Sequence, residues 1–439
     1  MNAKSTIWLS AALGMASVAA QAQSTEQLQQ ALSQAQAAAV QAQAAAAQAQ
    51  AALEKVMAAA ESAKSNGANA APAAQSGGSG ALTFTSGPAS ATLYGLIDVT
   101  LFNKSANGHS VAAPDVAWFS GNRWGINGAR KLGGDDDLKA IFRLESEFES
   151  ETGNMDTPGV LFNRDAWLGL ESKSLGKLTL GRQNALARDP AASAVYGDPY
   201  GSAKASLEEG GYSNNNNFKQ LIFYAGTANG TRINNGVTWK KAFSNGLVTG
   251  LQYSFGGVQD SFNTGSSETA SLAYNGNGFT VAGFATNANV ADLRHQSYSI
   301  GGNIQITPLV RLNAGYYNYA AQQAAGIGDR KDNAWTLSTK LTPEGKLDYE
   351  LGYQVMTANN AGLTGSGYVQ NAFSNTSGVT AVGSGNRATL YGSVFYHLDA
   401  ATELYAAFDH LSTTDTYLAS QAAGGKSADE FGVGMRFKF

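Results

Sequence analysis

The sequence predicts an all-β fold, a 16-stranded antiparallel transmembrane β-barrel, preceded by an N-terminal α-helical coiled-coil segment. Three observations lead to this prediction. From about residue 90 onward, large apolar and polar side chains alternate, which is the two-residue period of a β-strand. The connections between the alternating segments are short and long in turn. No segment after the first 22 residues holds the ~18 consecutive apolar residues that a membrane-spanning helix needs.

The first residues indicate an export signal. Lys4 supplies a positive charge, "TIWLSAALGMASVAA" supplies an apolar stretch, and Ala20 and Ala22 frame a cleavage site of the A-x-A kind. We expect a signal peptide over residues 1–22, cleaved after Ala20 or Ala22. A membrane helix is the competing interpretation, but the apolar run is short for one.

Residues 23–64 are almost entirely Ala and Gln with a few charges, and no Gly or Pro interrupts them. Leu28, Leu32, Leu53 and Val56 fall on the two core positions of a seven-residue repeat, which predicts a periplasmic coiled-coil helix. A flexible, partly helical spacer is the alternative. Residues 65–89 are rich in Gly, Ser, Ala and Pro and are expected to be a flexible linker before a barrel over residues 90–439.

The alternation is clear at the end of the chain, in "FGVGMRFKF". Phe437 and Phe439 share one face of the expected strand, and Arg436 and Lys438 share the other. We count 16 candidate strands, near 91–103, 117–130, 138–150, 160–171, 176–183, 231–242, 246–256, 267–275, 278–288, 295–307, 309–320, 332–342, 345–357, 386–398, 402–413 and 428–439.

Strands of a soluble sandwich also alternate, so the connections decide between the two folds. Short turns such as "FSNG" and "TPEG" are interleaved with long loops, the longest lying between Gln183 and Arg232. Short turns at one end and long loops at the other are typical of an outer-membrane barrel. A sheet in hydrocarbon must close on itself, because unpaired backbone groups are too costly there. The apolar face is then expected to meet lipid and the polar face a water-filled lumen.

Composition excludes several kinds of site. Cysteine is absent, which removes disulfides, zinc–thiolate centres and thiol nucleophiles. The net charge of -4 indicates no basic patch for nucleic acid, and we expect no nucleic-acid partner. The four His are far apart, and no H-E-x-x-H or G-x-S-x-G motif occurs. We therefore expect no enzymatic activity, no metal site and no cofactor.

Residues 91–439 resemble the general bacterial porins, a family of trimeric 16-stranded outer-membrane channels. The resemblance rests on "ATLYGLIDVT", "GNRWGINGARKLGG", "LKAIFRLESEF", "FNRDAWLGLES", "GKLTLGRQ" and the terminal "GVGMRFKF". It implies location in the cell outer membrane, contact with the bilayer and its lipopolysaccharide, a homotrimer, and a water-filled pore narrowed by the third long loop. The N-terminal helix is similar to the periplasmic extension of some dicarboxylate-type porins.

The resemblance also implies which residues narrow the pore. Wall arginines are matched by Arg123 in "NRWG", Arg164 in "NRDAWLGL" and Arg232 in "TRINNG". Acidic partners are matched by Glu145 in "RLES" and by Asp198 and Glu208 in the third loop. The terminal strand, with Phe437 and Phe439, is expected to be the membrane-insertion signal that the barrel-assembly machinery reads.

The alternation of side chains along each expected strand indicates which of these residues point inward. Arg164 is out of phase with Trp167, which we assign to the outer face, so Arg164 is expected to point inward. Arg182 shares a face with Leu178 and Leu180 and is expected at a subunit interface. A structural interpretation stays open for Arg143, Glu145 and Glu147, which could be ion pairs that hold the wall.

Three functional hypotheses follow. The first is a channel for passive diffusion of small hydrophilic solutes and ions, with a mild preference for anions. The second is a channel selective for small carboxylates, which would bind to the same arginines in succession. The third, from a different class, is an outer-membrane enzyme or a structural anchor whose helix holds the cell wall.

Overall fold

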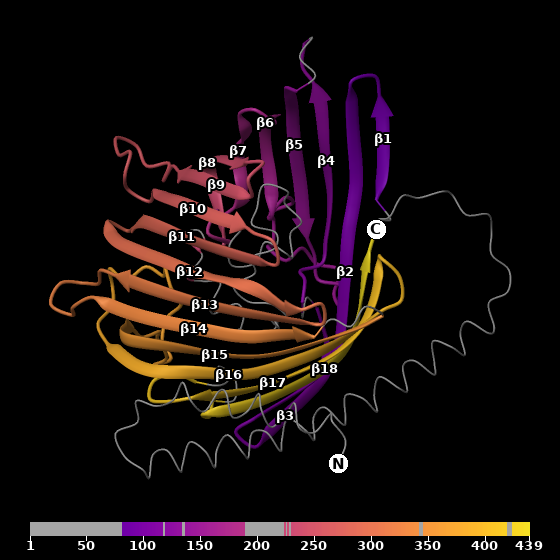
Figure 1. Ribbon diagram of the computed structural model, residues 1–439. Helices are drawn as coiled ribbons and strands as arrows, with labels where there is room; N and C mark the ends of the chain where they lie inside the picture. Colours follow the sequence, from indigo (N-terminus) through magenta and orange to yellow (C-terminus); the bar gives the residue numbers. More distant parts are fainter. Residues whose placement is uncertain are drawn as a thin grey trace, which may run out of the picture. The chain divides into compact units, whose positions relative to one another are not determined.

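The computed structural model describes residues 81–116, 119–133, 137–188, 224, 226–227, 230–341, 346–418 and 424–439. These residues form one sheet of 18 strands (Figure 1). The strands are β1 (Leu82–Ser86), β2 (Ala89–Ala106), β3 (His109–Val116), β4 (Arg123–Lys131), β5 (Lys139–Glu147), β6 (Asp165–Ser172), β7 (Gly176–Asn184), β8 (Arg232–Ala242), β9 (Leu247–Ser254), β10 (Ser267–Asn275), β11 (Phe279–Val290), β12 (Leu293–Thr307), β13 (Val310–Ala321), β14 (Arg330–Leu341), β15 (Leu347–Gly362), β16 (Val382–His397), β17 (Thr402–Thr413) and β18 (Ser427–Lys438).

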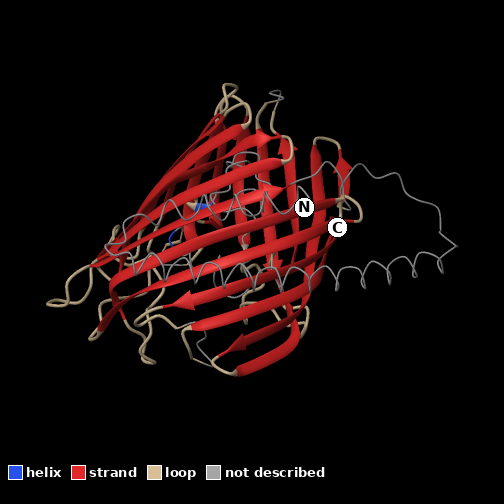
Figure 2. Ribbon diagram, turned by 60° about the horizontal axis from the view of Figure 1, so that its bottom comes forward, coloured by secondary structure: helices blue, strands red, loops and turns tan. Residues whose placement is uncertain are grey.

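The sheet closes into a barrel with 16 strand positions (Figure 2). From β4 to β18 each strand pairs antiparallel with the next, and β2 joins β18 to β4. One edge of β2 pairs with β1 over its first residues and with β18 over the rest. The other edge pairs with β4 and then with β3, so β3 and β4 together fill one position. The predicted 16-stranded antiparallel barrel is confirmed for the residues that the structure describes.

Two details of the sequence prediction are corrected at the start of the barrel. A single strand was expected over 117–130, but β3 ends at Val116 and β4 begins at Arg123. The break has a local cause, because the buried Asp98 carboxylate accepts hydrogen bonds from the backbone N–H groups of Phe119 (3.1 Å) and Ser120 (2.9 Å). The sheet also begins with β1, inside the segment 65–89 that was expected to be a linker.

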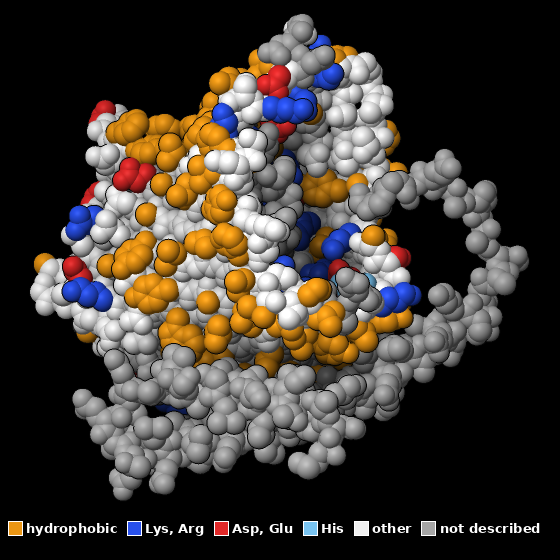
Figure 3. All heavy atoms as spheres, viewed as in Figure 1, with side chains coloured by type: hydrophobic (Ala, Val, Ile, Leu, Met, Phe, Trp, Pro, Cys, Tyr) orange, Lys and Arg blue, Asp and Glu red, His pale blue; other side chains and the backbone are white. Residues whose placement is uncertain are grey.

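The outer face of the barrel is apolar, as the alternation predicted. Leu168 is 64% exposed and Ile300 is 60% exposed, while Ser299, the neighbour of Ile300, is 5% exposed. Figure 3 shows apolar side chains spread over the wall of β10–β14 with charged ones at its rim. Hydrocarbon cannot hydrogen-bond to polar groups, so this is the surface that a lipid environment selects. Within the described residues, the structure has no helix of the length and hydropathy needed to span a membrane.

The inner face is apolar in one region, which the sequence did not predict. Phe284, Tyr317 and Met356 point inward from β11, β13 and β15 and are at most 5% exposed. They form one buried cluster with Phe373, from the loop between β15 and β16, and with Tyr224, from the long segment between β7 and β8. The wall can be apolar here because loop residues, and not water, cover it.

A buried ion pair fastens these loops to the wall. Arg330 is 2% exposed, and its guanidinium lies 2.6 Å from the carboxylate of Asp332, which is 1% exposed. The same guanidinium donates to the backbone carbonyl of Gln370 at 2.8 Å, and the Tyr224 hydroxyl donates to Asp332 at 2.9 Å. Burial, together with the nearby Asp332, raises the pKa of Tyr224 well above its ordinary value, so the hydroxyl remains a neutral donor.

The last residue closes the seam of the barrel. The backbone of Phe439 makes two hydrogen bonds with Gly95, at 2.7 and 3.0 Å. The Phe439 ring occupies the space that a Cβ at residue 95 would take, so a larger residue there would have to displace the ring. Phe437 points outward and is 41% exposed, while Arg436 points inward and donates to Glu403 at 2.7 Å. The faces predicted for this strand are thereby confirmed, and its role as an insertion signal stays a prediction.

Several sequence predictions lie outside the described residues. These are the signal peptide, the coiled-coil helix, most of the linker, and the third-loop acids Asp198 and Glu208. They remain predictions. The connection between β11 and β12 departs from the expected long loops, because it is a two-residue turn in which Ala291 and Asp292 have φ of 50° and 66°.

Candidate functional site: a charged cluster on the inner wall

The charged cluster is built on cross-strand rows of the inner face. In one row, Tyr94 of β2 pairs with Gly125 of β4, which pairs with Glu145 of β5. In the next row toward the loops, Arg123 of β4 pairs with Glu147 of β5. Because side chains two residues apart on a strand share a face, both glutamates project into the barrel from β5.

Arg164 joins the two glutamates. Its Nε donates to Glu145 and its Nη1 to Glu147, and its backbone N–H donates to the Glu145 carbonyl at 3.2 Å. Arg164 is 4% exposed and Glu145 is 6% exposed, so this ion-pair network is largely removed from solvent. Charge-assisted hydrogen bonds of this kind are about twice as strong as neutral ones.

Arg164 was correctly expected to point inward, but the reason given from the sequence was wrong. It precedes β6 and is not part of the pleat. Trp167 was assigned to the outer face, whereas it points inward, with Arg143 5.9 Å and Lys177 5.0 Å from its ring centroid. Leu168 takes the outward position. An aromatic ring is stable on this polar wall because the two cations lie against it.

The other two predicted arginines lie around the same carboxylates. Arg123 is 8% exposed and lies opposite Glu147 in the strand register. Arg232, the first residue of β8, interacts electrostatically with Glu147, as Arg123 and Arg164 do. The structure therefore brings together three arginines and one glutamate that were predicted from the sequence, Arg123, Arg164, Arg232 and Glu145.

Two residues of the cluster, Tyr94 and Asp165, were missed. The Tyr94 hydroxyl donates to Glu145 at 2.7 Å, and Arg143 lies 3.6 Å from Asp165. Gly121 leaves room for the Glu147 carboxylate, which a side chain at this position would have to displace. Asp165 follows Arg164 directly in "NRDAW", which is the one sequence signal that could have indicated it.

Asp98 is a positioning residue for the cluster. It fixes Phe119 and Ser120, and Asn122 accepts a hydrogen bond from the Asp98 backbone at 2.5 Å. The Asn122 carbonyl also accepts from Phe148 at 3.0 Å, just after Glu147. These contacts set where the chain re-enters the sheet, and hence where Arg123 lies.

A second group of cations lies lower on the same wall, near the short turns. One inner-face row joins Lys139 of β5, Glu171 of β6, Lys177 of β7 and Lys240 of β8. Lys139 precedes Arg143 by four residues on β5, which places it about 13 Å away along the strand. We call Lys139, Lys177 and Lys240 the lysine row. No sequence motif indicated it, because its members come from three separate strands.

Arg182 lies on the other side of the wall. It points outward with Leu178 and Leu180, as the pleat predicted. Its Nε donates to the Asn163 carbonyl at 2.7 Å and its Nη1 to Asn234 at 2.5 Å. Its place at a subunit interface stays a prediction.

The charged side chains of the inner wall act on passing ions through their electrostatic field. Guanidinium and ammonium groups outnumber carboxylates on the inner wall of β4–β8, in a barrel whose low-dielectric wall concentrates their field. Charged side chains that line a lumen set which ions enter it. A closed 16-stranded barrel with an apolar outer face and a charged inner wall defines a channel of the outer membrane.

The chain belongs to the Gram-negative porin family, whose model matches residues 9–416. An outer membrane porin protein of Bordetella pertussis is 34% identical over 185 residues, which are 38% of this chain and 43% of that protein. The matched region thus spans less than half of that relative. The protein is an outer-membrane porin.

Solved structures show the same fold. The anion-selective porin from Comamonas acidovorans superposes with a TM-score of 0.60 at 20% identity, over 80% of this chain and 100% of that one. OmpT of Vibrio cholerae in its trimer form gives 0.53 at 15% identity, over 80% and 99%. The outer membrane channel DcaP of Acinetobacter baumannii gives 0.52 at 11% identity, over 81% and 99%.

Proposed function

We propose that this porin lets small hydrophilic solutes and ions diffuse passively across the outer membrane, with a mild preference for anions. The observation that supports the anion preference is the lysine row, which adds positive charge to the inner wall below the charged cluster. The anion selectivity named for the Comamonas acidovorans porin supports the proposal by analogy of fold.

The charged cluster contributes less net positive charge than the number of its arginines suggests. Arg164 is compensated by Glu145 and Glu147, and Arg143 lies close to Asp165. Arg123 and Arg232 add positive charge around the same carboxylates. The cluster and the lysine row together make the wall positive, and an anion passing along it meets cations at two levels about 13 Å apart. Several weak sites in series favour permeation, because each one is easy to leave.

Replacing Lys240 with glutamine is expected to lower the chloride-to-potassium permeability ratio about twofold. A unit charge about 10 Å from an ion in water is worth ~0.4 kcal/mol, which corresponds to that factor. Adding Lys177→Gln is expected to bring the reduction to about fourfold. The measurement is the reversal potential across a planar bilayer under a potassium chloride gradient, at low salt so that screening is weak.

Lys241→Gln is the matched control for this experiment. Lys241 is the next residue on β8, but its ammonium donates to the Ser174 carbonyl and lies 4.9 Å from the Phe243 ring on the other side of the sheet. Its removal is expected to leave the ratio unchanged. Equal reversal potentials for the Lys240 and Lys241 variants would contradict the proposed role of the lysine row.

A channel selective for small carboxylates is the alternative. Arg164 already binds two carboxylates of the protein itself, which favours passive diffusion because that guanidinium is occupied. The lysine row supports the alternative, since several ammonium groups could hold a dicarboxylate. Block of single-channel current by micromolar succinate, with no block by chloride or sulfate, would decide for the selective channel.

We propose that the porin assembles as a homotrimer and that residues 23–64 form a coiled coil in the periplasm. The trimer form of Vibrio cholerae OmpT supports the first point. The four large apolar residues of the heptad pattern support the second. Deleting residues 23–64 and measuring the mass of the detergent-solubilised protein tests whether this segment holds the subunits together.

We further propose that the terminal strand is read by the barrel-assembly machinery, since Phe439 completes the seam.

A further inference from the structure

The loop between β15 and β16, residues 363–381, packs against the inner face of the barrel. Its Ala372 and Phe373 belong to the buried apolar cluster of the inner wall. The Phe373 ring centroid lies 5.1 Å from that of Tyr319, and the two side chains are 4% and 1% exposed. Tyr319 shares the inward face of β13 with Tyr317. The loop therefore occupies part of the lumen.

A continuous chain of hydrogen bonds holds the loop in this place. The Thr376 hydroxyl donates to the Gln322 carbonyl at 2.7 Å and lies 3.2 Å from Nε2 of His295. Nδ1 of His295 lies 2.8 Å from the Tyr319 hydroxyl, whose oxygen accepts from the Phe373 backbone N–H at 2.7 Å. Because the Thr376 hydrogen is already used, the His295 Nε2–H donates to Thr376, and Nδ1 accepts from Tyr319. Every donor in this chain has an acceptor, so the loop is fixed to β12 and β13.

The side of the loop that faces away from the wall is polar and uncharged. The wall side is formed by Ala372, Phe373, Thr376 and Val379, which are buried, and the exposed residues include Asn371, Asn375, Ser377 and Thr380. Residues 363–381 contain no Asp, Glu, Lys, Arg or His. This loop therefore brings hydroxyl and amide groups, and no charge, to the lumen.

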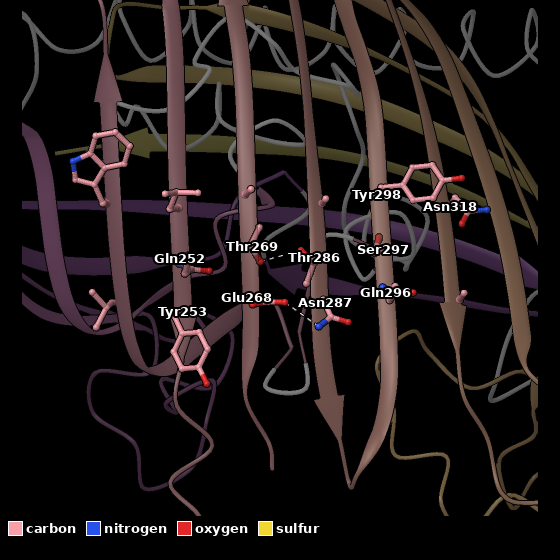
Figure 4. Close-up of a pocket in the computed structure, with 16 residues that line it drawn as sticks. Gln252, Tyr253, Glu268, Thr269, Thr286, Asn287, Gln296, Ser297, Tyr298 and Asn318 are labelled. Atoms are coloured by element: carbon pink, nitrogen blue, oxygen red, sulfur yellow. Dashed lines mark hydrogen bonds between the residues drawn. The ribbon is translucent and has the colours of Figure 1, made fainter. Parts of the chain in front are cut away.

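The inner wall next to the loop is uncharged as well. One cross-strand row of the inner face joins four residues that Figure 4 labels on β9–β12: Gln252, Thr269, Thr286 and Ser297. All four are at most 6% exposed. The hydroxyls of Thr269 and Thr286 share a hydrogen bond of 2.9 Å, and Ser297 donates to the Tyr224 carbonyl at 2.5 Å. The uncharged side of the lumen thus extends from the loop to β9.

This uncharged side faces the charged cluster across the barrel. In the ring of 16 strand positions, β12 is the eighth strand after β4, and β13 is the eighth after β5. The strands that hold the loop therefore lie opposite the strands that hold Arg123 and Glu145. Both features lie at the same end of the barrel, since Arg123 begins β4 and His295 is the third residue of β12.

We propose that residues 363–381 are a second narrowing element of the pore, which limits the size of solutes and keeps its side of the ion path uncharged. Pore diameter sets the size limit of a channel, and the charge of its lining sets the ion preference. The resemblance to the porin family implied narrowing by a different loop, the one between β7 and β8. This inference rests on the open pore of the proposed function, and it stands whether or not the channel prefers anions.

The test uses a single introduced thiol. The chain has no cysteine, so Asn375→Cys places one thiol on the exposed side of the loop. Channels of the full-length variant are recorded in planar bilayers before and after reaction with an anionic or a cationic methanethiosulfonate of similar size. The anionic label is expected to lower the chloride-to-potassium permeability ratio about twofold and the cationic label to raise it about twofold, because a unit charge about 10 Å from an ion in water has this effect.

Lys331→Cys is the matched control. Lys331 is exposed and points outward from β14, so its labels are expected to leave the ratio unchanged. Mass spectrometry measures how much of each thiol has reacted. Absence of reaction at residue 375, shifts of the same sign with both reagents, or equal shifts at both positions would overturn the proposal. Equal permeabilities to chloride and potassium in the wild type would contradict the proposed anion preference, and the label shifts would still test the loop.

Replacing residues 364–380 with a short Gly-Ser linker tests the size limit. The variant is expected to show a higher single-channel conductance and faster swelling of liposomes in a tetrasaccharide relative to a disaccharide. Heat-resistant migration in gels checks that it folds, since the deletion uncovers the apolar wall around Tyr319. Wild-type conductance and swelling in the folded variant would show that the loop does not narrow the pore.

Discussion

Replacing Arg330 with methionine is expected to lower the free energy of unfolding by about 3–5 kcal/mol, since it leaves the buried carboxylate of Asp332 without a counter-charge. Arg330 contacts Asp332 through Nε, at 3.0 Å, and Nη2, at 2.6 Å, and both side chains are at most 2% exposed. The variant also loses the hydrogen bond to the Gln370 carbonyl. The measurement is the urea midpoint of the barrel in detergent micelles.

Two comparisons separate the ion pair from a general effect of the substitution. The double variant Arg330→Met, Asp332→Leu removes both charges and is expected to regain most of the lost stability, because replacing a whole buried pair by apolar groups is often neutral. Lys331→Met changes the adjacent, exposed residue and is expected to have no measurable effect. Instability of the double variant equal to that of Arg330→Met would show that the charges are not the cause.

The second large effect is expected for Arg164→Met. It removes a side chain that bonds both Glu145 and Glu147, and each carboxylate then faces the other on the same strand. We expect a loss of about 3 kcal/mol, the lower end for removing one partner of a buried ion pair, because Arg123 and Arg232 still lie around the two carboxylates. The ion selectivity is also expected to move toward cations, because the inner wall loses one positive charge and exposes two negative ones.

Arg182→Met is the control for Arg164→Met. Arg182 is half-exposed, lies on the outward face, and within the described part of the chain donates to the Asn163 carbonyl and the Asn234 amide oxygen rather than to a carboxylate. It should change neither the urea midpoint nor the reversal potential by a comparable amount. Adding Glu147→Gln to Arg164→Met is expected to restore part of both properties. A wild-type reversal potential in Arg164→Met would remove this arginine from the ion path.

The number and faces of the strands could be predicted because they depend on a local pattern. Ile300 and Ser299 differ in exposure as the alternation requires, and the same holds for Phe437 and Arg436. The break between β3 and β4 could not be predicted in this way. It depends on Asp98, whose role as an acceptor for Phe119 and Ser120 exists only after β2 and the later segment are side by side.

The site could be predicted in part for a similar reason. Arg123, Arg164 and Glu145 stand in short stretches that are recognisable on their own. Trp167 was assigned to the wrong face because a large aromatic residue on a barrel strand usually meets lipid, and the cations that stabilise it come from β5 and β7. The apolar inner wall around Phe284 was missed because the loop that covers it is 89 positions away, at Phe373.

The short strand β1 limits how the barrel can close between β2 and β18. It occupies the edge of β2 up to Leu93, and β18 takes the same edge from Gly95 onward. A slip of the terminal strand by two residues would run into Leu82, and a slip by one would turn Arg436 toward lipid. The hairpin of β1 and β2 therefore fixes the register in which β18 pairs with β2. That pairing joins segments more than 300 positions apart, so closure must wait for β18, which then has one place to dock.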